Sequence, residues 1–358
     1  MGEMPVPADA LYGASTARAV ANFPIANRPL PSAVIHAFGH LKAACAQANK
    51  DLGRLDAKLA DAIIAAADEV AQGKHDAHFP VDVYQTGSGT STNMNANEVI
   101  ATLANQRLQG VPASAGMKVH PNDHVNMGQS SNDTFPTAIY IAGATELSRT
   151  LRPALGKLAE ALTEKAEAWD EIVKVGRTHV MDATPIRMGQ VFEGFAQQII
   201  DADGYASWSI EELLHNLAIG GTAVGTGINA HPEFAEKVAS TLTTRVPISV
   251  YGEEPSEDHG FLARPSPKSN ATKDNFVQAH AYLKTLAVAL SKIANDIRHL
   301  GSGPRCGIGE LVLPAIQPGS SIMPGKVNPV ICESVMQVCC RVIGNDATVT
   351  MAGMGGVG

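Results

Sequence analysis

The chain has 358 residues, 45% of them hydrophobic and 17% charged, which is the composition of a globular protein able to bury a large core. Lys and Arg number 27 against 35 Asp and Glu, so the net charge is −8, which disfavours a nucleic-acid-binding protein because phosphates need a basic face. No apolar run approaches membrane-spanning length, so a membrane protein is not expected either.

The five cysteines argue against a disulfide framework, a zinc site or an iron–sulfur cluster, because their number is odd and no Cys-x-x-Cys occurs. They are Cys45, Cys306, Cys332, Cys339 and Cys340. Free thiols favour a reducing compartment. We therefore expect the cytoplasm, or the mitochondrial matrix if a targeting segment has been removed, since the N-terminus lacks the apolar region of a secretory signal.

Residues 1–136 are expected to form a mostly helical N-terminal domain. Within it, apolar residues at helical spacing predict helices, and clusters of Pro, Gly and polar residues predict loops. Asp56 is the expected N-cap of one helix, and Gly73 is expected to end it. The expected helices cover residues 31–52, 56–72 and about 93–107. Residues 1–30 and 110–136 are expected to be loops, and residues 74–95 are a polar stretch.

Residues 137–358 are expected to form a central helical bundle, because their Ala/Leu/Ile-rich stretches are too long for a compact α/β domain. The clearest stretch has a broad apolar face that ends at Gly301. The last helix, opened by Pro329, breaks into Gly-rich sequence after about Thr350, so we expect it to be truncated and a C-terminal domain to be absent. Helical stretches cover 137–173, 190–217 and 274–300, and an irregular segment covers 244–273. The predicted fold class is mainly α.

Four polar, Gly-rich segments interrupt these apolar stretches, and each by itself is more typical of a turn than of a site. The first, Thr86–Asn93, precedes a predicted helix and contains Ser88, Gly89 and Thr90. Glycines let backbone N–H groups approach a ligand, and a helix N-terminus favours an anion; an elaborate N-cap is the alternative. A nucleotide phosphate loop is disfavoured, because the segment lacks the Lys-Ser/Thr pair and follows no strong strand.

The next two segments add hydrogen-bonding groups and one candidate acid or base. The second contains His120, Pro121, Asn122 and Asp123, and then Ser130, Ser131 and Asn132. The third, Gly176–His179, lies where one helical stretch ends and another starts, and its histidine can exchange protons near neutral pH. A lone histidine is more often a surface residue, so this interpretation depends on the combination of segments.

The fourth segment, Gly319–Pro329, is the most specific. It contains two serines, Ser320 and Ser321, together with Lys326 and Asn328. A flexible surface loop would explain its glycines and prolines, but not the Ile, Met and Val among them. Lysine in such a loop can bind a carboxylate.

This string resembles the signature of the fumarase/aspartase superfamily, and the other three segments resemble the remaining active-site segments of that family in the same order. The resemblance runs from Met1 to about Asp346. His179 after Thr178, the His-Pro-Asn-Asp string at 120–123 and Ser130-Ser131-Asn132 are similar to class II fumarases rather than to aspartases. The implied fold is the fumarase/aspartase type, with a helical N-terminal domain and a long central bundle.

The resemblance implies a role for each matching residue. Ser320 would remove the C3 proton of malate, His179 would activate the water, and Glu333 would orient that histidine. Lys326 would act at the substrate carboxylate together with a set of hydroxyl, amide and backbone groups, and a second dicarboxylate site would lie near the entrance. The implied substrate-binding residues are Ser88, Gly89, Thr90, Ser130, Ser131, Asn132, Thr178, Ser321 and Asn328. The implied secondary site consists of His120, Pro121, Asn122 and Asp123.

The implied reaction is the reversible hydration of fumarate to L-malate through an aci-carboxylate carbanion, with no metal and no organic cofactor. Family members are homotetramers whose sites combine three subunits, and they continue beyond the end of this chain. Two alternatives remain open at this point: a catalytically inactive fragment or dicarboxylate-binding protein of the same fold, and an aspartate ammonia-lyase. The intact segments favour the hydratase.

Overall fold

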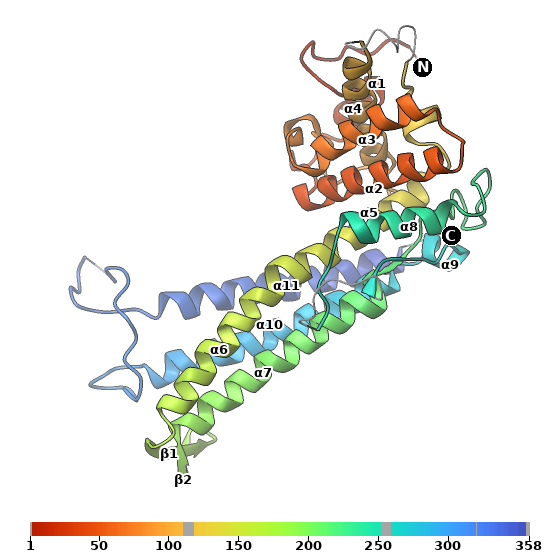
Figure 1. Cartoon of the computed structure of the whole chain (residues 1–358). Helices are drawn as coiled ribbons and strands as arrows, with labels where there is room; N and C mark the ends of the chain where they lie inside the picture. Colours follow the sequence, from red (N-terminus) through yellow and green to blue (C-terminus); the bar gives the residue numbers. More distant parts are fainter. Residues whose placement is uncertain (1, 110–117, 252–258, 320, 356–358) are drawn as a thin grey trace. The chain divides into compact units, whose positions relative to one another are not determined.

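The computed structural model describes residues 2–109, 118–251, 259–319 and 321–355, and it is mainly helical, as predicted. The chain divides into two compact units (Figure 1). Unit 1 is formed mainly by Met1–Thr150 and Ile210–Phe276, and unit 2 by Leu151–Ser209 and Val277–Gly355. The division predicted between a domain of residues 1–136 and one of residues 137–358 stays a prediction. Within the described ranges, no helix is both long and apolar enough to span a bilayer.

Unit 1 is a helical assembly with one short parallel strand pair. Asn216 of β3 (Asn216–Leu217) pairs with Leu262 of β4 (Leu262–Ala263). Its helices, with the helical turns at its borders, are α1 (Ala14–Asn22), α2 (Ser32–Asp51), α3 (Ala57–Ala71), η1 (Asp76–His78), α4 (Thr90–Gln109), η3 (Pro121–Val125), α5 (Ser131–Glu146), η4 (Leu147–Leu151), η5 (Ser209–Leu214), α8 (Phe234–Arg245) and α9 (Pro267–Ala271).

Helix α2 forms the centre of unit 1, where it packs against α3, α5 and α8. Its Phe38 and Leu41 are fully buried. At Gly39 the helix lies so close to the backbone of Ala71 in α3 that a Cβ would overlap it. The predicted N-cap of α3 is confirmed, because the Asp56 carboxylate accepts hydrogen bonds from the first-turn N–H groups of that helix.

Unit 2 contains α6 (Arg152–Ala168), α7 (Met188–Trp208), α10 (Asp274–Leu300, from Val277 onward) and α11 (Val330–Met354), which run alongside one another (Figure 1). An antiparallel hairpin, β1 (Val173–Thr178) with β2 (Met181–Arg187), connects α6 to α7. The rings of Trp169 and Phe192 pack perpendicular to each other, with centroids 4.8 Å apart. The buried core of this unit comprises Leu155, Leu162, Met188, Phe192, Phe195, Ala196, Ile199, Ala202, Leu286 and Ile293.

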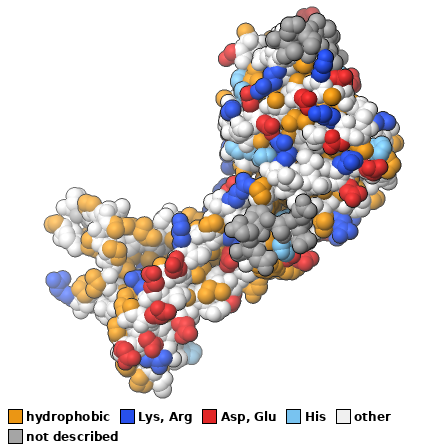
Figure 2. All heavy atoms as spheres, viewed as in Figure 1, with side chains coloured by type: hydrophobic (Ala, Val, Ile, Leu, Met, Phe, Trp, Pro, Cys, Tyr) orange, Lys and Arg blue, Asp and Glu red, His pale blue; other side chains and the backbone are white. Residues whose placement is uncertain are grey.

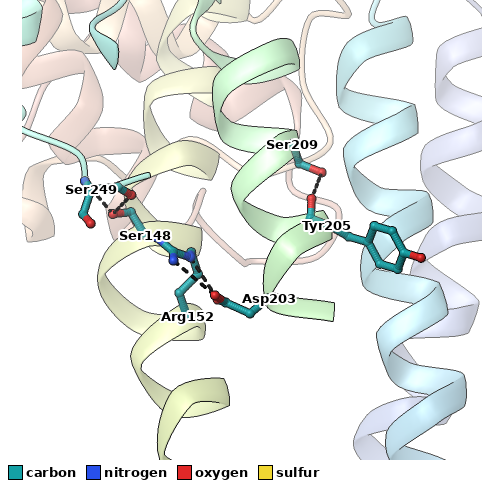
Figure 3. Close-up of polar contacts among 6 residues, drawn as sticks. All are labelled: Ser148, Arg152, Asp203, Tyr205, Ser209 and Ser249. Carbon is teal, nitrogen blue, oxygen red and sulfur yellow. Dashed lines mark hydrogen bonds and ion pairs between the residues drawn. The ribbon is translucent and has the colours of Figure 1, made fainter. Parts of the chain in front are cut away.

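Polar contacts fix the ends of several helices (Figure 3). In unit 2, the guanidinium of Arg152 donates two hydrogen bonds to the carboxylate of Asp203, at 2.9 and 3.1 Å, and so joins α6 to α7. The Ser209 hydroxyl donates to the Tyr205 carbonyl at 2.8 Å. In unit 1, the Ser148 hydroxyl donates to the Ser249 carbonyl at 3.0 Å and accepts from the Ser249 N–H at 3.2 Å.

The loop predicted over residues 1–30 is wrong at α1. That helix receives its cap from a distant residue: the Glu98 carboxylate accepts from the backbone N–H groups of Gly13, Ser15 and Thr16, and from the Thr16 hydroxyl. The local sequence holds no cap of its own. The N-terminus of α1 is therefore capped by a side chain more than 80 positions away in the sequence.

Several predicted boundaries also need correction. Helix α4 begins at Thr90 rather than near Asn93, and α5 begins at Ser131 within the predicted loop, because Ser130 and Asp133 form a capping box. The stretch predicted as helix over 137–173 contains the π-helical turn η4 and ends at Ala168. The stretch predicted over 190–217 ends as α-helix at Trp208, and α11 continues past Thr350 to Met354. The helix predicted over 274–300 is confirmed.

Candidate active site

A cluster of hydroxyl groups joins two of the predicted segments within unit 1. The Thr90 hydroxyl lies 2.8 Å from the Ser88 hydroxyl and 2.8 Å from the Ser131 hydroxyl. Thr90 opens α4 and Ser131 opens α5, so the N-termini of two helices meet at this cluster. Unpaired N–H groups and the helix dipole make such termini favourable for an anion.

The turn before α4 requires a glycine at its centre. Gly89 has a φ of +69°, a conformation that L side chains rarely adopt, and a Cβ there would overlap the ring of Phe135. Its carbonyl accepts the hydrogen bond from the Asn93 N–H at 3.1 Å, and its own N–H donates to the Thr86 carbonyl. The turn thus brings the hydroxyls of Ser88 and Thr90, the two neighbours of Gly89 in the sequence, within hydrogen-bonding distance of each other.

The start of α5 is anchored by the fully buried carboxylate of Asp133. One oxygen accepts from the Ser130 N–H at 2.9 Å, and the other accepts from the N–H groups of Gly220 at 3.1 Å and Thr222 at 2.7 Å. Burial raises the pKa of Asp133 to about 6, while these N–H donors act in the opposite direction. The carboxylate thereby holds Ser130 and Ser131 in place.

Sequence reasoning missed the Gly-rich loop at 220–229. The Asn132 amide donates to the Ala223 carbonyl at 2.8 Å, so this loop contacts the predicted substrate-binding residue directly. Gly220 and Gly225 adopt positive φ, and a Cβ on Gly225 would overlap the backbone of Ser266. The signal was present, since four glycines and two threonines occur within residues 220–227, between apolar stretches.

The predicted secondary site forms a compact surface turn in unit 1. His120 is the N-cap of η3, and its Nδ1 lies 3.2 Å from the Asp123 N–H and 3.1 Å from the Asp123 carboxylate. Pro121 opens the turn, and Asn122 and Asp123 are exposed. These four residues are therefore together, as contiguous sequence requires, and their role as a dicarboxylate site stays a prediction.

In unit 2, His179 lies at the exposed tip of the β1–β2 hairpin. This hairpin connects α6 to α7, so the segment does lie between two helices as predicted, although the hairpin itself was not predicted. His179 and Val180 form the two-residue turn with φ of 57° and 65°. Two positive φ values give the twist that a tight hairpin needs, although this conformation is unfavourable for a β-branched valine. Thr178 is the last residue of β1, directly before the turn.

The signature segment folds back on itself before α11 begins. Gly319 lies against the carbonyl of Lys326, where a Cβ would overlap it, and the Lys326 N–H donates to Met323. Ser321 and Lys326 are exposed and Asn328 is half-buried. Ser320, the predicted base, lies outside the described residues.

The predicted pairing of His179 with Glu333 stays a prediction. Glu333 is exposed in the first turn of α11, and its N–H donates to the Pro329 carbonyl at 3.1 Å. The hydrogen bonds found among the described residues do not join its carboxylate to His179. The structure thus assembles Ser88, Thr90, Ser130, Ser131 and Asn132 in unit 1, and presents Thr178, His179, Ser321, Lys326, Asn328 and Glu333 in unit 2.

These two groups of side chains differ in chemistry. The unit 1 cluster offers neutral hydroxyls, an amide and two helix N-termini, which suit a bound carboxylate. Unit 2 offers an exposed imidazole, which can exchange protons, and an exposed ammonium, which can neutralise developing negative charge.

Comparison with known proteins identifies lyases with similar sequences and a similar fold. The model of a lyase family matches residues 2–344. A fumarate hydratase class II from Corynebacterium glutamicum is 54% identical over 99% of this chain and 72% of its own length, and one from Mycobacterium tuberculosis is 52% identical over 99% and 71%. The crystal structure of a class II fumarase from Schistosoma mansoni superposes with a TM-score of 0.92 at 40% identity, covering 99% of this chain and 75% of that one.

Proposed function

Because the chain belongs to the class II fumarate hydratase family and has the fold of that family, we propose that it catalyses the reversible hydration of fumarate to L-malate. The observation that carries this proposal is the hydroxyl cluster of Ser88, Thr90 and Ser131 at the N-termini of α4 and α5. Hydroxyl donors at two helix N-termini favour the binding of one carboxylate of a small dicarboxylate, which supports the proposal. The family relationship disfavours both alternatives left open by the sequence.

In the malate-to-fumarate direction, the proposed base Ser320 takes the C3 proton. The electron pair left on C3 spreads into the neighbouring carboxylate, giving an aci-carboxylate dianion. Preorganised donors must stabilise this charge, and such stabilisation is worth several kcal/mol in enzymes. The C2 hydroxyl then leaves as water, with its proton supplied through His179, and the C2–C3 double bond forms.

The other residues of the proposed site bind substrate or position the two residues that transfer protons. Lys326 and Asn328 bind the charge-bearing carboxylate, and Ser321 supports the base. Glu333 orients His179 from a neighbouring copy of the chain. Direct substrate contacts are proposed for Ser88, Gly89, Thr90, Ser130, Ser131, Asn132 and Thr178, and the entrance site for His120, Pro121, Asn122 and Asp123. We propose that no metal or organic cofactor takes part.

We further propose a homotetramer in the cytoplasm that serves the tricarboxylic acid cycle. Large hydrophobic side chains are exposed along the helices of unit 2, which supports burial against other copies, and hydrophobic side chains are visible at the surface in Figure 2. They include Ile200, Val288, Val338, Ile343 and Met351. Light scattering tests this assembly, and an active monomer would contradict it.

The deciding experiment follows fumarate by its ultraviolet absorbance after the purified protein is mixed with L-malate. Parallel reactions contain L-aspartate in place of malate, or malate with a chelator. Fumarate formed from malate alone, at a rate that chelator does not change, is the expected result. A folded protein that forms fumarate from neither substrate would support the dicarboxylate-binding alternative, and fumarate from aspartate would support the ammonia-lyase.

A further inference from the structure

A buried lysine lies behind the hydroxyl cluster. Lys42, in the middle of α2, is fully buried. Its ammonium donates to the side-chain oxygens of Asn93 at 2.7 Å, Asn126 at 3.0 Å and Gln129 at 2.9 Å. An ammonium has three N–H donors, so all of them are satisfied, and each acceptor is a neutral amide.

These three amides belong to the two segments that form the cluster. Asn93 lies in the first turn of α4, three residues after Thr90, and Gln129 directly precedes Ser130. The amides also bond to one another, because Asn93 donates to the Asn126 oxygen at 3.2 Å. The Thr134 hydroxyl donates to the Asn93 oxygen at 3.2 Å, which extends the network into α5.

A charge in this position costs free energy that an apolar side chain would not. Burial lowers the pKa of Lys42 to about 8, against the opposing effects of Cys45 and Asp133. A methionine would fill nearly the same volume without that desolvation cost. The ammonium is therefore best explained by what its hydrogen bonds hold in place.

We propose that Lys42 is a positioning residue for substrate binding, acting through its three amide partners to keep Thr90 and Ser131 at the spacing that receives a carboxylate. This proposal rests on the proposed function, because it assigns the cluster to fumarate and malate. Neither Thr90 nor Ser131 touches Lys42 through a hydrogen bond of the described network, so the effect passes through Asn93 and through the segment from Asn126 to Ser130.

The test compares Lys42→Met with Lys50→Met. Lys50 lies on the same helix, and its ammonium pairs at the surface with Asp61, so the same substitution there is a matched control. We expect Lys42→Met to raise the KM for L-malate and for fumarate about tenfold or more, because a displacement of about 1 Å at a binding group can cost a hundredfold. Lys50→Met should leave both constants unchanged.

Two further variants separate positioning from simple support of the fold. Lys42→Gln keeps N–H donors in the network and should recover part of the lost affinity. Asn126→Leu removes one acceptor while leaving the ammonium, and it should raise the KM in the same direction by a smaller factor. Lys42→Met with an unchanged KM, or a KM that Lys42→Gln fails to improve, overturns the proposal.

Amide hydrogen exchange gives a readout that does not need turnover. In Lys42→Met, exchange should accelerate over residues 90–93 and 126–134 and stay unchanged in α3. Acceleration spread over all of unit 1, or none, overturns the proposal. If the wild-type protein forms no fumarate, the proposed function fails, and the exchange pattern still decides whether Lys42 holds these two segments together.

Discussion

His215 should make the protein lose stability in mild acid. It lies directly before β3 with only 2% of its surface exposed, its ring packs on Phe261 with centroids 5.0 Å apart, and its Nε2 has no hydrogen-bond partner in the described part of the chain. Burial lowers the pKa of His215 from 6.5 to about 4, and the nearby His259 acts in the same direction. The folded protein therefore keeps this imidazole neutral.

The size of this loss in the free energy of unfolding follows from the difference in proton binding between the folded and unfolded chains. Above pH 6.5 neither the folded nor the unfolded chain protonates His215, so the full stability is present. As the pH falls from 6.5 toward 4, the unfolded chain gains a proton that the folded chain does not, and the free energy of unfolding drops by about 1.4 kcal/mol per pH unit. The total loss from this one residue is about 3 kcal/mol.

Urea denaturation from pH 7.5 to 4 measures this loss. His215→Leu should flatten the decline by about 3 kcal/mol relative to wild type. His40, whose pKa burial and Arg245 also lower to about 4, titrates in both proteins and cancels in the difference. Ile63→Ala, at a fully buried position of α3, is the packing control, and it should lower stability by the same amount at every pH. Parallel curves for wild type and His215→Leu would refute the reasoning.

Three other substitutions test the fold and the chemistry. A Gly→Ala change usually stabilises a helix interior, but Gly39→Ala should lower the free energy of unfolding by about 1 to 3 kcal/mol, because the new Cβ overlaps the backbone of Ala71. Urea denaturation measures this loss, and a gain in stability would contradict the close packing of α2 on α3. Glu98→Ala should lower the free energy of unfolding by about 3 kcal/mol and make α1 susceptible to limited proteolysis, since the Glu98 carboxylate caps the N-terminus of α1. An unchanged cleavage pattern would mean that other contacts hold α1 in place. His179→Asn should lower kcat for malate dehydration by about a hundredfold or more while subunit assembly by light scattering stays unchanged, and a wild-type rate would place water activation on another group.

The elements that the sequence predicted best are those whose signals are local. Helix α3 begins after its own cap, Asp56, and α10 matches its apolar face from Asp274 to Leu300. Helix α1 escaped prediction because its cap, Glu98, comes from α4. The β1–β2 hairpin escaped because its turn uses His179 and Val180 rather than the Gly or Asn that usually marks such a turn.

The sequence predicts which segments contribute to the candidate site, but not how these segments are placed relative to one another in space. The polar segments around Thr90 and Ser131 stand out in the sequence, yet the 2.8 Å contact between them depends on how α4 and α5 pack. Lys42 could not be singled out, because in the sequence it lies inside an alanine-rich helical stretch and its amide partners lie 51 to 87 positions away. Long-range partners of this kind leave no local pattern.

The shared carboxylate of Asp133 has a consequence for how this sequence can diverge. It satisfies N–H groups at the start of α5 and in the Gly220–Thr222 turn at once. A change that removed it would leave buried donors orphaned in both places, and a change in the length of either segment would pull the other out of register. One side chain therefore ties the placement of these two segments to each other, although 87 positions separate Asp133 from Gly220.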